Sequence, residues 1–212
     1  MADGVGPALI GLLGVGVGAV LTYVRELVTH GQRERQSRTF LAIQVGAALE
    51  RYASACADVA NDDGSYPGQP DDEFRKATVQ RPTFDPEQLK VEWRTLNPPL
   101  MYAVLDLPRR AEIADRAIEI VGEFDDEAPE FGAFFQERQY QYAMLGIRAW
   151  EQAQLLRELV GLPPRTADEW SPMPELLKGK AWVEERRAAV EAHRNTVYPL
   201  PPLPPLPPSP ET

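Results

Sequence analysis

A run of twenty residues without a charged side chain, residues 5–24, constrains this chain more than any other feature. As an α-helix the run would be about 30 Å long, which matches the hydrocarbon thickness of a bilayer. A cleaved signal peptide is disfavoured because no basic residue precedes the run and the run exceeds the usual apolar core of such a peptide. A surface-lying helix is disfavoured because the run has no polar face, and a buried core helix is rarely apolar all round. The run therefore predicts a transmembrane helix.

Basic residues flank this predicted span on one side only. No Lys or Arg precedes it, whereas Arg25, Arg33, Arg35 and Arg38 follow it. Positive charge is retained on the cytoplasmic side of a membrane, so we expect a single-pass protein of the cell membrane (inner or plasma membrane) with its N-terminus outside and its C-terminal domain cytoplasmic. Anionic lipid is the expected partner of these arginines.

Small residues recur on one face of the predicted span, at Gly11, Gly14 and Gly18. Such a face lets two membrane helices approach closely, and it includes a GxxxG pair, so it favours a homo-oligomer formed through the transmembrane helix. The alternative is that glycine is simply common in membrane helices. Both interpretations stay open from the sequence.

Composition excludes several classes of function. A formal net charge of −10 over 212 residues disfavours a nucleic-acid partner, because phosphate binding needs a basic surface. The single cysteine, Cys56, excludes an intramolecular disulfide and a cysteine-based zinc site, and two histidines exclude a multi-histidine site. We assign no catalytic, cofactor-binding or metal-binding residue.

Helical periodicity dominates the rest of the chain and predicts a mainly α fold, with four or five coiled-coil-like helices in a bundle-like soluble domain. Helices are expected from Phe40 to Asn61, from Pro98 to Leu105, from Pro108 to the acidic turn at 123–130, at 129–160 and at 174–194. The helix at 129–160 should be central to the bundle. The helix that starts at Pro108 carries one stripe that we expect to be buried, formed by Ile113, Ala117, Ile120 and Phe124 and widened by Ala114, Ile118 and Val121.

The stretch at 77–95 supports two interpretations. Leu89, Val91 and Trp93 alternate with charged residues, which indicates a strand that could pair with residues 77–80 in a short β hairpin. Asp85 followed by Pro86 instead indicates the start of a helix.

Residues 196–212 form a proline-rich tail that we expect to be disordered, because proline lacks an amide donor and fixes its own φ angle. A polyproline helix has three residues per turn, so Leu200, Leu203 and Leu206 would align along one edge. The tail either docks in an aromatic-lined groove of a protein partner or is an exposed end without a function.

Two polar clusters are candidates for chemistry. Carboxylates at 123–130 could bind a divalent cation or act as acid and base, but acidic residues between helices are usually a solvated turn. The aromatic phrase FFQERQYQY at 134–142 fits a core stripe with a polar flank, or a binding groove. In both cases the structural interpretation is favoured.

The predicted organisation is a transmembrane anchor at 1–24, a basic juxtamembrane stalk at 25–38, a helical domain at 39–195 and the tail at 196–212. The favoured function is a membrane-anchored helical interaction or scaffold protein rather than an enzyme. One alternative is a membrane-tethered, metal-dependent hydrolase or transferase that uses the 123–130 carboxylates. Another is a membrane effector that oligomerises through its glycine-faced helix.

Overall fold

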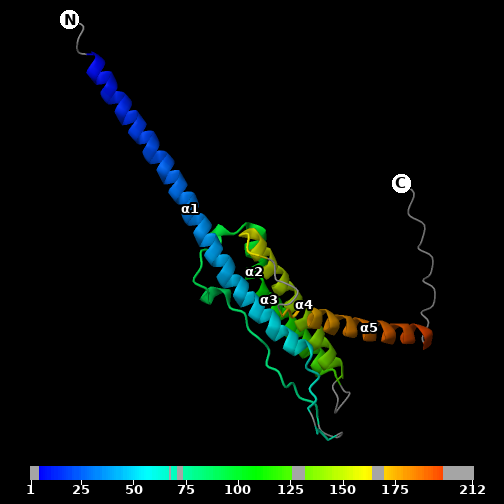
Figure 1. Ribbon diagram of the computed structural model, residues 1–212. Helices are drawn as coiled ribbons and strands as arrows, with labels where there is room; N and C mark the ends of the chain where they lie inside the picture. Colours follow the sequence, from blue (N-terminus) through cyan, green and yellow to red (C-terminus); the bar gives the residue numbers. More distant parts are fainter. Residues whose placement is uncertain (1–4, 67, 71–73, 126–131, 164–169, 198–212) are drawn as a thin grey trace, which may run out of the picture. The chain divides into compact units, whose positions relative to one another are not determined.

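The computed structural model describes residues 5–66, 68–70, 74–125, 132–163 and 170–197 (Figure 1). The side chains of residues 5–24, 27, 28, 195 and 197 lie outside this description. The described residues form five α-helices and two 3₁₀ turns and contain no strand, which confirms the mainly α prediction. The proline-rich tail, with Leu200, Leu203 and Leu206, lies outside the described residues.

Helix α1, Val5–Ala60, runs for 56 residues without a break. It continues through the basic stalk and through Gly31, which is exposed, because one glycine costs a helix only about 1 kcal/mol. The predicted anchor is helical, but the surroundings of Gly11, Gly14 and Gly18 lie outside the description, so the anchor and its packing face stay predictions. Within the described part of the chain, no helix combines the length and apolarity needed to cross a membrane.

Four shorter helices follow: α2, Pro98–Leu105; α3, Leu107–Glu123; α4, Gly132–Leu159; and α5, Met173–Val197. Helix α2 begins where predicted, because the Asn97 side chain accepts a hydrogen bond from the N–H of Leu100 and Pro98 needs no acceptor. Helix α4 ends at Leu159 and is followed by a glycine with positive φ, Gly161, and the N–H of Leu162 donates back to the carbonyl of Arg157.

The stretch at 77–95 is neither a hairpin nor a regular helix. It contains two single 3₁₀ turns, η1 at Pro86–Gln88 and η2 at Trp93–Thr95. The Asp85 side chain caps η1 as the sequence indicated. The strand prediction is wrong because the chain turns at Lys90, where the N–H of Val91 donates to the carbonyl of Leu89 at 2.9 Å.

The described chain divides into two compact units, and α1, α3 and α4 each contribute residues to both. The first unit comprises Met1–Ser54, Pro82–Glu112 and Arg148–Trp170. Its buried apolar residues come from α1, from the loop before α2, from α2 and α3, and from the second half of α4. They are Leu41, Ala42, Val45, Leu49, Tyr52, Ala53, Leu96, Leu100, Val104, Leu107, Ala149, Trp150, Ala153 and Leu156.

The second unit comprises Ala55–Arg81, Ile113–Ile147 and Ser171–Thr212. Its buried apolar side chains come from the end of α1, from α3, from the first half of α4 and from α5. They are Cys56, Ala57, Val59, Ala60, Ala114, Ile118, Phe135, Tyr142, Ala143, Leu145, Leu176 and Val183. Cys56 is a buried core residue, as its position beside the apolar stripe indicated.

The prediction for the apolar stripe of α3 is wrong for its main row and confirmed for two of the residues expected to widen it, Ala114 and Ile118. Ile113, Ile120 and Phe124 are 51%, 58% and 80% exposed, whereas Ala114 and Ile118 are buried. Two neighbouring rows of apolar residues on α3 both follow the helical period, so periodicity alone could not tell which row faces the core. The row displaced by one position is the buried one.

Gly146 of α4 lets three segments of the second unit pack closely. A methyl group added there would lie 2.6 Å from Cδ2 of Leu176 and 2.9 Å from Cβ of Cys56. We expect Gly146→Ala to lower the free energy of unfolding by about 1 to 2 kcal/mol, because overpacking outweighs the gain in helix propensity. Gly46→Ala, which meets nothing within 4 Å, should instead raise it by up to about 1 kcal/mol. Urea unfolding followed by circular dichroism would measure both, and equal effects would contradict this assignment.

Candidate functional site

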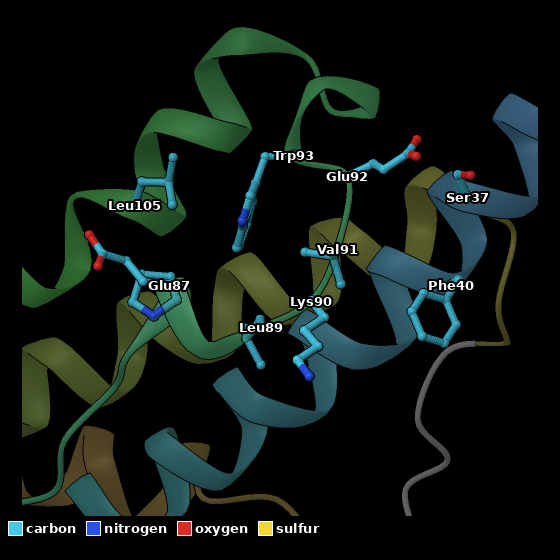
Figure 2. A pocket seen from close by; sticks show the side chains of 10 residues that line it. Ser37, Phe40, Glu87, Leu89, Lys90, Val91, Glu92, Trp93 and Leu105 are labelled. Carbon is cyan, nitrogen blue, oxygen red and sulfur yellow. The ribbon is translucent and has the colours of Figure 1, made fainter.

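The first unit carries a pocket of about 720 Å³ that we call the Trp93 groove (Figure 2). Helix α1, the loop with η1 and η2, and the end of α2 all contribute to it. The lining residues are Ser37, Phe40, Pro86, Glu87, Leu89, Lys90, Val91, Glu92, Trp93 and Leu105. Figure 2 shows the Trp93 ring between Leu105 and Val91.

Apolar side chains form most of this groove and remain accessible in it. Phe40 is 54% exposed and Leu105 is 40% exposed, while Leu89, Val91 and Trp93 are half-buried. Large apolar groups that gather in one concave site and stay accessible are typical of a binding surface.

Contacts on both sides hold the loop of the Trp93 groove in place. Before η1, the Phe84 ring packs on Tyr52 of α1 with their centroids 5.8 Å apart. After η2, Nε of Arg38 donates to the carbonyl of Thr95 at 3.0 Å. The loop is therefore ordered before any ligand arrives, which lowers the entropy cost of binding.

The charged lining residues have mixed signs and lie among apolar neighbours. Glu87, Lys90 and Glu92 are exposed, and Ser37 is the one hydroxyl among the ten lining residues. No histidine, cysteine or aspartate accompanies Ser37 in the lining, so these ten residues contain no nucleophile and base pair of the usual kind. The groove is suited to binding a ligand that presents both apolar and polar groups.

The indole N–H of Trp93 is a further binding element. An indole nitrogen can donate a hydrogen bond but cannot accept one. Among the described residues, no acceptor contacts this N–H. A ligand carbonyl that lies over the apolar lining could therefore accept it.

A buried polar site lies in the second unit, where Asp62 and Arg138 form an ion pair at 2.8 Å. Asp62 also accepts hydrogen bonds from the N–H groups of Gly64, Thr78 and Val79 and from the hydroxyl of Thr78. Burial alone raises the pKa of Asp62, but these hydrogen bonds and the charge of Arg138 outweigh it and hold the pKa below its usual value. Arg138 also donates to the carbonyl of Val79, so the pair fastens this loop to α4.

The aromatic phrase at 134–142 is a core stripe, as favoured, but its polar part is buried too. Phe135 and Tyr142 are buried, and so are Arg138 and Gln139. The hydroxyl of Tyr142 donates to Oδ1 of Asp115 at 2.8 Å, and burial followed by this bond raises the pKa of Tyr142. The buried polar residues of the segment at 134–142 therefore form hydrogen bonds inside the second unit.

The acidic stretch at 123–130 is described only in part. Glu123 is exposed, and Oδ2 of Asp125 accepts the N–H of Phe134 at 2.7 Å near the start of α4. Asp126, Glu127 and Glu130 lie outside the described residues. In the part of the chain that the structure covers, no three His, Cys, Asp or Glu side chains gather to hold a metal ion.

None of the groove residues was predicted as a site from sequence. The sequence did contain one signal. The apolar residues between Pro82 and Pro98 do not follow the helical period, but their alternation with charged residues indicated a strand instead of a binding surface. Their convergence on Phe40 and Leu105 depends on tertiary contacts. The chain has no match among protein-family models, curated proteins or solved structures.

Proposed function

We propose that this chain is a membrane-anchored interaction protein whose Trp93 groove binds extended, proline-rich segments of partner proteins. The observation that carries the proposal is the ordered, accessible cluster of Phe40, Leu89, Val91, Trp93 and Leu105. Aromatic-lined grooves are the usual receptors for polyproline helices.

The polar features of the groove favour an extended ligand over a helical one. A polyproline helix makes no internal hydrogen bonds, so its carbonyl groups are free to accept from the protein, whereas those of an α-helix are mostly used internally. The Trp93 indole N–H is a donor of the required kind. Stiff polyproline segments also lose little entropy on docking.

The membrane part of the proposal rests on residues 5–38. The uncharged run at 5–24 and the arginines that follow it lie on one continuous helix. We propose that residues 5–24 span the cell membrane with the N-terminus outside. Arg25 and Arg33 are exposed and suited to anionic lipid headgroups, and the groove would be presented on the cytoplasmic side.

Replacing Trp93 should remove peptide binding. We expect a labelled peptide of residues 199–210, used as a proline-rich probe, to bind the detergent-solubilised full chain in a fluorescence anisotropy titration. Trp93→Ala should weaken binding about 30-fold, since a central tryptophan typically contributes about 2 kcal/mol or more to an interface.

The matched control is Trp182→Ala, because Trp182 lies on α5 and is 44% exposed. This variant should bind the probe as the unmodified chain does. A peptide in which serines replace the three leucines should bind more weakly, because the apolar edge is lost. Equal binding by the Trp93→Ala and Trp182→Ala variants would contradict the assignment of the groove.

A further inference from the structure

The outer face of α3 in the second unit carries an exposed apolar row. It consists of Ile113, Ala117 and Ile120 on α3 and of Phe124 in the turn directly after the helix, and the three large side chains are 51%, 58% and 80% exposed. We call this row the α3 seam. Three large, accessible apolar residues in one row along a helix and its terminal turn are more than scattered surface hydrophobes and indicate an interaction surface.

The spacing of the α3 seam is that of a coiled coil. Successive members are four, three and four residues apart, which assigns Ile113 and Ile120 to heptad position d and Ala117 and Phe124 to position a. In an antiparallel pair of identical helices, Ala117 would face Ile120 of the other copy, and Phe124 would face Ile113. Each contact would then occur twice about a two-fold axis, as a self-complementary interface requires.

Charged residues at the border of the α3 seam also favour an antiparallel pair of identical helices. Arg116 and Glu123 both occupy heptad position g, both are exposed, and neither forms an ion pair with another described residue. Antiparallel pairing would place Arg116 of each copy beside Glu123 of the other. Parallel pairing would instead place Arg116 beside the apolar e-position residue Val121 and Glu123 opposite a position beyond the end of α3, so both charges would be unpaired.

We propose that the α3 seam binds the α3 seam of a second copy of this chain, as an antiparallel two-fold pair. The interface combines apolar layers with two reciprocal Arg116–Glu123 contacts. It shares no residue with the Trp93 groove or with the predicted glycine face of residues 5–24.

Site-directed cross-linking tests the orientation of the pair. Two full-length populations are prepared in a Cys56→Ala background, one with Arg116→Cys and one with Glu123→Cys, and each is treated with a short bis-maleimide. The mixture should form a cross-linked heterodimer more efficiently than either population alone, because along the helix axis equivalent positions would be farther apart by about 5 Å for Arg116 and about 10 Å for Glu123. Equal or more efficient cross-linking within a single population, or none in the mixture, would overturn the proposal.

A seam variant tests the interface itself by sedimentation of the detergent-solubilised full chain. Ile120→Lys should raise the dimer dissociation constant at least about 30-fold, as expected for loss of a central interface anchor. Val190→Lys is the matched control, because Val190 is 68% exposed on α5 and lies outside the seam. The cross-link should be lost with Ile120→Lys and kept with Val190→Lys. A dimer that is unchanged by Ile120→Lys would assign association to another surface and overturn the proposal.

Discussion

Replacing Asp62 by Asn should lower the free energy of unfolding of this protein by about 3 to 5 kcal/mol, because the substitution leaves a buried guanidinium without its counter-charge. The side chains of Asp62 and Arg138 are only 2% and 1% exposed, and 2.8 Å separates Oδ2 from Nη1. Neither charge can recover its solvation by turning toward water. The cost of one unpaired buried charge therefore dominates the effect.

Asparagine has the same shape as aspartate but cannot replace it as an acceptor here. Both carboxylate oxygens of Asp62 accept hydrogen bonds, from Gly64 and the Thr78 hydroxyl on one side and from the N–H groups of Thr78 and Val79 on the other. The side-chain amide of asparagine has only one oxygen. Its NH₂ group would therefore replace one carboxylate oxygen and would face N–H or O–H donors whose hydrogen bonds it cannot accept. The hydrogen bonds from Arg138 to the carbonyl of Val79 and from Gln139 to the carbonyl of Asp62 would then be left to attach these residues to α4.

The same pair predicts a pH dependence. The folded-state pKa of Asp62 lies below that of the unfolded chain, so its contribution to stability is complete above the unfolded pKa of about 3.9 and is lost as the pH falls through the folded value. The difference in unfolding free energy between the unmodified chain and Asp62→Asn should be constant above about pH 5 and should shrink below pH 4. Urea titrations at a series of pH values would measure it, and a constant difference down to pH 3 would contradict the assignment.

Two further variants test whether the loss of stability comes from the buried Asp62–Arg138 pair and not from the loss of any ion pair. Glu184→Gln removes an exposed ion pair with Lys180 on α5 and should leave stability unchanged within error. Asp62→Asn combined with Arg138→Met should cost less than the sum of the single changes, because the double variant leaves no charge buried alone. Additive costs would show that the two side chains act independently.

Local chemistry made the helices predictable. Asn97 before two prolines and Gly161 after a long apolar period are short-range signals, and the structure places helix boundaries at both. The mainly α class follows from the same periodicity, since the stripes at 41–59 and 135–156 are largely buried. Signals of this kind depend on residues within one or two turns of one another.

Long-range contacts were not predictable in this way. Asp62 and Arg138 are 76 positions apart, and in the sequence Asp62 is one of two aspartates in a turn. The Trp93 groove depends on Phe40 and Leu105 meeting a loop that has no periodicity of its own. Helix α3 has two neighbouring apolar rows, and the row with Ala114 and Ile118 is the one that is buried. Each outcome is decided by tertiary packing.

Gly64→Ala should also destabilise the second unit strongly, by about 2 to 4 kcal/mol, for two independent reasons. Gly64 has φ of +73°, a conformation that side chains disfavour. A methyl group there would lie 2.7 and 2.9 Å from Cε1 and Cε2 of Phe135, and closer still to Cζ. Phe135 is buried in the core, so its ring cannot move aside without disturbing its neighbours.

Gly68 separates the two causes, since its φ is +85° but nothing lies within 4 Å of an added methyl group. Gly68→Ala should therefore show the backbone cost alone, about 1 kcal/mol. In a Phe135→Leu background the ring is absent, so the additional cost of Gly64→Ala should fall toward that of Gly68→Ala. Urea unfolding of the four single and double variants measures the coupling. If Gly64→Ala costs no more than Gly68→Ala in the unmodified chain, the ring does not restrict this position, and backbone conformation alone requires the glycine.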